Sequence, residues 1–316
     1  MEVELHPQAR VVLQGLLNVP NRVATPDLAA LRGVKPGMNA LVGGGEDVFR
    51  AWTSAIPLNG GAIPVRWYVP TTAAPEQLTV FVHGGGWVSG TLDDYDAMCR
   101  SLALRSGGAV VSLDYSLSPE ARFPIAIEQV RSAILNAAAL ARPEGLDIGR
   151  VAVAGDSAGG NLVAGALHTM AADNQPMPAK AVFVYPATDT SMDHESWRQI
   201  GSDYNLNETK MVWFWEQYLG PGWQTKADLA RSPQSSPLLS EHLHRFPESL
   251  VVTATHDPLK DEGKAFHARL KAAGIASQHI EVPGQIHGFL RFRGAMTDPV
   301  WGADAVMQKI GTFLKS

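Results

Sequence analysis

The strongest indication of the fold of this chain is the segment VAVAGDSAGGNLVAGALHTMAA, residues 151–172. It begins as a short apolar strand, turns at GDSAG (155–159), and continues with apolar positions at helical spacing. Small residues permit a turn so tight that Ser157 is lifted clear of a sheet, where its hydroxyl can act as a nucleophile. The same pattern also occurs as a glycine-rich turn with an idle serine, so the context has to decide.

Apolar strands and helices alternate on both sides of this turn. The sequence predicts strands at 78–82, 109–113, 151–155, 181–185, 250–254 and 277–282, and helices at 125–141, 158–172 and 259–274. Residues 48–56 and 63–69 flank Asn59-Gly60, a strong hairpin turn signal. Short, nearly all-apolar strands separated by helices predict an α/β fold, a mostly parallel sheet with helices on both faces.

One long stretch breaks the alternation and suggests a helical cap over the carboxyl ends of the strands. Residues 187–245 carry no strand signal, and such a long connection is unusual inside a compact domain. Residues 1–45 also look helical, with Thr25-Pro26-Asp27 as a start signal. We therefore predict an N-terminal cap part at 1–45, core at 46–186, a cap insertion at 187–245 and core again at 246–316.

Composition excludes several classes of protein. The 316 residues carry a net charge of −5, so no basic field exists to hold a nucleic acid. No apolar run approaches a membrane span, and the acidic N-terminus is unlike a signal peptide. The single cysteine, Cys99, suits a reducing compartment, and we expect a cytoplasmic protein. No residue cluster has metal-site spacing and no dinucleotide motif follows a strand, so neither a metal nor a cofactor is expected.

The string His83-Gly84-Gly85-Gly86 directly follows the predicted strand at 78–82. Acyl transfer places negative charge on a carbonyl oxygen, and backbone N–H groups stabilise that charge. Glycines allow the backbone to approach closely, so we predict an oxyanion hole from Gly84, Gly85 and the N–H of Ala158. A phosphate-binding loop is the weaker reading, because the usual Gly-Lys-Ser/Thr does not follow.

A nucleophilic serine needs a base and an acid that orients it. His287 follows the last predicted strand, whereas His279 lies within that strand and His267 lies in the middle of a helix, so we choose His287 as the base. Asp257 ends a strand and is predicted to be the acid. Its neighbour His256 should point to the opposite face of the sheet.

Five motifs occur in one order along the chain: HGGGW, DYSLSPE, GDSAGGN, DPLKDEG and IHGF. From about residue 45 onward the chain thereby resembles the hormone-sensitive-lipase family of bacterial esterases. The resemblance implies an α/β-hydrolase fold with a helical cap, and the same triad and oxyanion residues. It also allows a homodimer through the sheet edge. Ser116, Ser118 and His256 depart from the family pattern, although none of them belongs to the triad.

Four side chains are placed in the predicted substrate pocket: Trp87, Asp156, Phe214 and Trp215. Trp87 could equally fill space beneath the cap. Met211, Phe214, Trp215 and Tyr218 share one helical face, which favours packing of the cap on the core over lining of the substrate entrance.

These residues predict a serine carboxylesterase that acts on short- to medium-chain esters through an acyl-enzyme. An acyltransferase or amidase with the same triad is the first alternative. The second is a small-molecule binder without catalysis, against which the complete triad counts.

Overall fold

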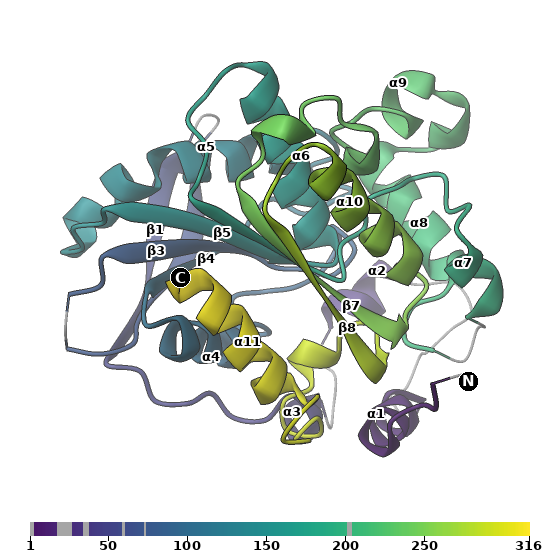
Figure 1. The fold of residues 1–316 in the computed structure, drawn as a ribbon, viewed down its shortest axis with the longest axis horizontal. Coiled ribbons are helices and arrows are strands. Elements are labelled where there is room, and N and C mark those ends of the chain that lie inside the picture. Colours follow the sequence, from purple (N-terminus) through teal and green to yellow (C-terminus); the bar gives the residue numbers. More distant parts are fainter. Residues whose placement is uncertain (1–2, 18–26, 34–37, 59–60, 73, 201–203) are drawn as a thin grey trace.

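A single twisted sheet runs through the protein in the computed structural model, which describes residues 3–17, 27–33, 38–58, 61–72, 74–200 and 204–316 (Figure 1). Its strands are β1 (Arg50–Leu58), β2 (Gly61–Val69), β3 (Gln77–Val82), β4 (Ala109–Leu113), β5 (Arg150–Asp156), β6 (Lys180–Val184), β7 (Glu248–His256) and β8 (Ser277–Ile286). Their spatial order is β1-β2-β4-β3-β5-β6-β7-β8. Of these strands, only β2 runs in the direction opposite to the others, which confirms the mostly parallel sheet.

Helices cover both faces of this sheet, as the alternating pattern predicted. The described helices are α1 (Pro7–Leu17), α2 (Leu28–Arg32), α3 (Met38–Val42), α4 (Asp96–Ser106), α5 (Ile125–Ala141), α6 (Ala158–Ala172), α7 (Glu195–Gln199), α8 (Glu208–Leu219), α9 (Ala227–Ala230), α10 (Lys260–Ala272) and α11 (Ala303–Lys315). Short 3₁₀ helices are η1 (Arg142–Glu144), η2 (Trp223–Thr225), η3 (Pro237–Leu239), η4 (Leu243–Arg245) and η5 (Phe289–Arg291). Helices α5, α6 and α10 lie on one face, and α4 and α11 lie on the other (Figure 1).

The hydrophobic core is divided by the sheet into two layers. Phe183 and Phe266 contact edge to face in the layer beneath α6 and α10, with ring centroids 5.2 Å apart. Cys99, on α4, is fully buried in the opposite layer. Alternating side chains of the parallel strands supply both layers, because successive residues of a strand point to opposite faces.

The segment between β6 and β7 forms α7, α8, α9 and three 3₁₀ helices, with no strand among its described residues. Of these helices, α8 lies beside α2 (Figure 1). The start of α2 is capped by Asp27, whose carboxylate accepts the N–H of Ala29 at 3.2 Å. Thr25 and Pro26, and the predicted turn residues Asn59 and Gly60, lie outside the described residues.

The side chain of Arg32 joins helix α2 to the core. Arg32 donates to the carbonyl oxygen of Val88 at 2.7 Å and forms two hydrogen bonds of 2.8 Å with the carboxylate of Glu120. This pairing lowers the pKa of Glu120 to about 2. Within the part of the chain that the structure describes, every helix is too short or too polar to span a bilayer.

Candidate active site

Ser157 lies in the turn between β5 and α6. Its backbone has φ 55° and ψ −120°, a conformation that residues other than glycine rarely adopt. The turn depends on its flanking glycines. A Cβ on Gly159 would lie 2.0 Å from the carbonyl oxygen of Val82, and a Cβ on Gly155 would lie 2.5 Å from that of Gly159. The small residues of GDSAG therefore let the helix approach the sheet, and this exposes the serine hydroxyl at the carboxyl edge.

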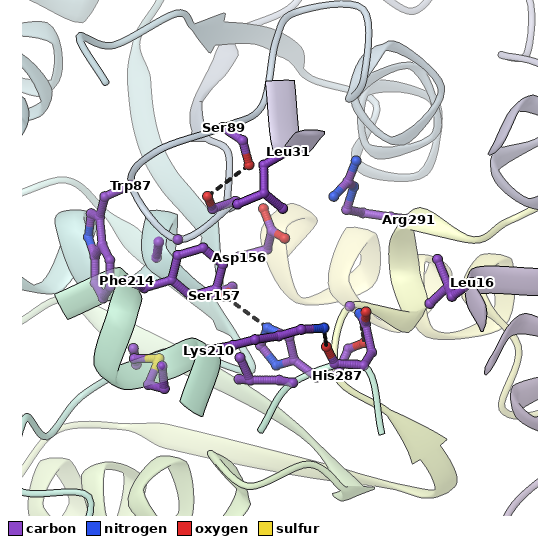
Figure 2. A pocket seen from close by; sticks show the side chains of 18 of the residues that line it. Leu16, Leu31, Trp87, Ser89, Asp156, Ser157, Lys210, Phe214, His287 and Arg291 are labelled. Atoms are coloured by element: carbon purple, nitrogen blue, oxygen red, sulfur yellow. Dashed lines mark hydrogen bonds between the residues drawn. The ribbon is translucent and has the colours of Figure 1, made fainter. Parts of the chain in front are cut away.

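Three side chains from three strand ends meet in one hydrogen-bonded line. The oxygen Oγ of Ser157 lies 2.8 Å from Nε2 of His287, and Nδ1 of His287 lies 2.7 Å from Oδ2 of Asp257 (Figure 2 shows the first pair). Asp257 is fully buried, and its second oxygen accepts the N–H of Leu259 at 2.9 Å. An ionised carboxylate only accepts, so His287 carries its proton on Nδ1 and offers Nε2 to the serine.

Neighbouring groups hold His287 in this position. The ring of Tyr185 contacts it edge to face, with centroids 4.9 Å apart. The backbone oxygen of His287 accepts a hydrogen bond from the side-chain amide of Asn205 at 3.1 Å. The order β5-β6-β7-β8 places the three strand ends within reach of one another.

The glycine loop, residues 83–86, follows β3, which is the direct neighbour of β5. The prediction that Gly84 contributes its N–H to the oxyanion hole is wrong. The N–H of Gly84 donates to Oδ1 of Asp156 at 2.7 Å, so it is not available to an oxyanion. Gly85 and Gly86 instead border the cavity at Ser157, and neither N–H donates to an acceptor among the described residues. Ala158, at the first position of α6, has no acceptor within its own helix.

The loop is held by its own carbonyl and by His83. The oxygen of Gly85 accepts from the N–H and the hydroxyl of Ser89, at 3.1 and 3.0 Å. Nδ1 of His83 donates to the oxygen of Gly84 at 2.8 Å, and its ring stacks on Tyr115 at 4.4 Å. Burial lowers the pKa of His83 to about 4, so this neutral histidine has the structural role that fixes the loop.

A cavity of about 230 Å³ opens at Ser157. Its wall includes Trp87, Met211 and Phe214, from the core and from α8, and Leu31 from α2 (Figure 2). Asp156 also borders it, and burial raises the pKa of this carboxyl to about 6. Among the described residues no cluster of three or more metal-ligating side chains could hold a metal ion.

The predicted pocket residue Trp215 does not border this cavity. It is fully buried and packs on Trp87, with ring centroids 4.3 Å apart, while Tyr218 stacks on the same ring at 4.7 Å. The helical face of α8 is therefore divided: Met211 and Phe214 reach the cavity, whereas Trp215 and Tyr218 pack the helix on the core. A helical stripe alone cannot distinguish these two environments.

The three departures from the family pattern have ordinary partners. Ser116 shares two hydrogen bonds of 2.8 Å with Gln129, and the hydroxyl of Ser118 donates to the oxygen of Ala121 at 3.0 Å. The ring of His256 stacks on Tyr204, with centroids 5.6 Å apart.

Two histidines that the sequence left as alternatives pair with each other away from the site. His267 and His279 stack at 5.4 Å and bond to Ser277 and Thr253. Several residues of the site were missed, among them Gly86 and Arg291. Gly86 was already visible as the third glycine of HGGG, whereas Arg291 borders the cavity and gave no signal in the sequence.

Comparison with known proteins gives consistent results. Residues 79–291 match a family with the α/β-hydrolase fold. The chain is 39% identical over 242 residues to the carboxylic ester hydrolase LipN of Mycobacterium tuberculosis, covering 75% of this chain and 63%, just under two thirds, of LipN. It is 34% identical over 260 residues to the ethyl acetate hydrolase of Pseudomonas putida, covering 81% and 80% of the two chains.

A solved structure extends the likeness to nearly the whole chain. The hyperthermophilic esterase of the archaeon Pyrobaculum calidifontis superposes with a TM-score of 0.88 at 32% identity, covering 99% of this chain and 98% of that one.

Proposed function

This chain belongs to the α/β-hydrolase fold family, it is a carboxylic ester hydrolase, and we propose that Ser157, His287 and Asp257 carry out its reaction. The observation that carries the proposal is the continuous line of hydrogen bonds from Ser157 through His287 to buried Asp257. The line joins a nucleophile, a base and an orienting acid, each at hydrogen-bond distance from the next.

The reaction begins when the hydroxyl of Ser157 attacks the ester carbonyl and passes its proton to Nε2 of His287. The new negative charge on the carbonyl oxygen is stabilised by the N–H groups of Gly85, Gly86 and Ala158. The positive charge on the imidazole is stabilised by Asp257.

The intermediate then collapses and the ester C–O bond breaks. His287 gives its proton to the departing alcohol, which leaves an acyl group on Ser157. Water attacks this acyl-enzyme with His287 again as base, and the carboxylic acid is released while the serine regains its proton.

We further propose that residues 1–45 and 187–245 act as the cap of this site and limit substrate size. Leu31, on α2, and Met211 and Phe214, on α8, border the cavity, which supports a role for both segments. A volume of about 230 Å³ is small for a ligand site and fits esters of short to medium chain length. The cytoplasmic location and the homodimer stay predictions from the sequence.

The test is hydrolysis of p-nitrophenyl esters, from acetate to a long-chain acyl group, by wild type and Ser157→Ala. We expect short chains to be favoured and the variant to lose about 10⁴-fold or more in kcat. Circular dichroism controls for folding of the variant. Equal turnover by the two folded proteins would remove Ser157 from the mechanism, and release of ester or amide products from added acceptors would favour an acyltransferase.

A further inference from the structure

Arg291 is a cation in the wall of the cavity at Ser157 that has no hydrogen-bond partner among the described residues. It ends η5, four residues after His287, and its side chain is 20% exposed. Its nearest carboxylate oxygen, Oδ1 of Asp94, is 3.9 Å away, and the guanidinium carbon lies 4.7 Å from the centre of the Tyr95 ring. The nitrogen Nε is buried without a partner.

Arg293, two residues further on, shows how this chain satisfies an arginine that only holds the fold. Its Nε donates to Asp304 at 2.8 Å, Nη1 donates to the oxygen of Ala97 at 2.7 Å, and Nη2 donates to Glu46 at 2.6 Å. A charged donor without an acceptor is costly once it is shielded from water. The contrast indicates that the acceptor for Arg291 comes from outside the chain.

Two carboxylates also border the cavity, and both are already engaged. Oδ1 of Asp156 accepts the N–H of Gly84 at 2.7 Å, and Oδ2 accepts the hydroxyl of Tyr95 at 3.3 Å. Asp27 accepts the N–H of Ala29 at the start of α2. Neither carboxylate forms an ion pair with Arg291, and Asp94 approaches it only to 3.9 Å. The N–H groups of Nη1 and Nη2 are therefore available to a ligand, whereas Nε is buried.

The cation and the aromatic wall lie on opposite sides of the nucleophile. Figure 2 shows Ser157 between Trp87 and Phe214 on one side and Arg291 and Leu16 on the other. An ester whose carbonyl lies at Ser157 therefore extends one of its halves toward the aromatic rings and the other toward the guanidinium.

We propose that Arg291 binds a carboxylate carried by one half of the ester, so that the preferred substrates are esters with a free acid group. A planar guanidinium matches a carboxylate with two parallel hydrogen bonds, which are stronger than hydrogen bonds between neutral groups. This inference rests on the proposed function, because it assigns a substrate class to the same site.

The experiment compares kcat/KM for acids and for uncharged esters of the same shape. One set carries the acid in the acyl half: the monoethyl esters of succinic, glutaric and adipic acids. The other carries it in the alcohol half: the butyryl esters of 3-hydroxypropionic and 4-hydroxybutyric acids. In each matched ester an isopropyl group replaces the carboxylate, and the proteins are wild type, Arg291→Met and Arg291→Lys.

We expect wild type to prefer at least one acid over its uncharged match, and the half that carries that acid identifies the half that faces Arg291. Arg291→Met should lower this preference roughly 10- to 100-fold, the value of a charge-assisted pair, and Arg291→Lys should retain part of it. The control is Arg198→Gln, which removes the same charge from an exposed site on α7 and should leave the preference unchanged.

Wild type without any preference for the acids would overturn the proposal, and this comparison needs no variant to fold. An equal loss on acids and uncharged esters in Arg291→Met would also overturn it, because the arginine would then only balance Asp156. Ser157-dependent turnover of the uncharged esters tests the hydrolase separately, so failure of the proposed function is distinguishable from failure at Arg291.

Discussion

The sheet edge and the cap contribute to one cavity, but they are held in different ways. Ser157, Asp257 and His287 each follow a strand, and the register of the parallel ladder fixes where those strands end. Helix α8 has no ladder to fix it. It is positioned by packing of Trp215 and Tyr218 on Trp87.

One buried acid connects the two regions. Oε1 of Glu262, on α10, accepts the N–H groups of Thr188 and Asp189 at 2.6 and 3.3 Å, and Oε2 accepts Nε1 of Trp197 at 3.3 Å. It therefore holds the start of the cap insertion against the core. Changes at the sheet edge should therefore affect the chemical step, whereas changes in the cap should affect stability first.

The largest effect is expected at the sheet edge, from Asp257→Asn. An asparagine fills the same space but no longer requires the proton of His287 on Nδ1, so Nε2 ceases to be the base. We expect kcat for a short-chain ester to fall by about 10⁴-fold. The free energy of unfolding, measured by urea titration, should fall by far less than the free-energy equivalent of this loss in kcat. A variant with nearly full activity would show that Asp257 does not orient the base.

A cap residue should show the opposite behaviour. Trp215→Ala removes a fully buried ring from between the helix and the core, and large-to-small changes of this kind lower the free energy of unfolding by about 3–5 kcal/mol. Trp213→Ala is the matched control, because Trp213 lies on the same helix and is only partly buried. Similar losses in the two variants, measured by urea titration, would refute the division of α8 into a packed and a less buried face.

The smallest effect is a pH dependence at the connection between the regions. Burial raises the pKa of Glu262 well above its ordinary 4.5, so the folded protein holds this proton where the unfolded chain releases it. That contribution to stability is complete below about pH 4.5 and is lost as the pH rises through the folded pKa. The Glu262→Gln variant has no titratable group at this position.

Wild type should therefore lose stability relative to Glu262→Gln as the pH rises from 5 to 8. The loss is roughly 1.4 kcal/mol for each unit of the pKa shift traversed. Unfolding free energies measured in urea at both pH values test it, and a constant difference between the two proteins would contradict the raised pKa.

Sequence patterns located the strands and the longer core helices because both depend on local periodicity. The helices predicted at 125–141 and 158–172 have those bounds in the structure, and β4 covers 109–113. Strand β8 was predicted to end at 282 and continues to Ile286, because Pro283 and Gly284 interrupt the strand signal of its last residues. Glu262 illustrates a limit: an acid in a first helical turn looks ordinary, and only its burial under the cap gives it partners.

The fold class and the three groups proposed for catalysis could be predicted from the sequence, because short motifs at strand ends require particular residue types. The contacts of other residues in and around the site became visible only in the folded protein. The N–H of Gly84 donates to Asp156, Trp215 packs on Trp87 outside the cavity lining, and Arg291 borders the cavity without a hydrogen bond to any described residue. Each outcome depends on a contact between residues far apart in the chain, and local periodicity carries no information about such contacts.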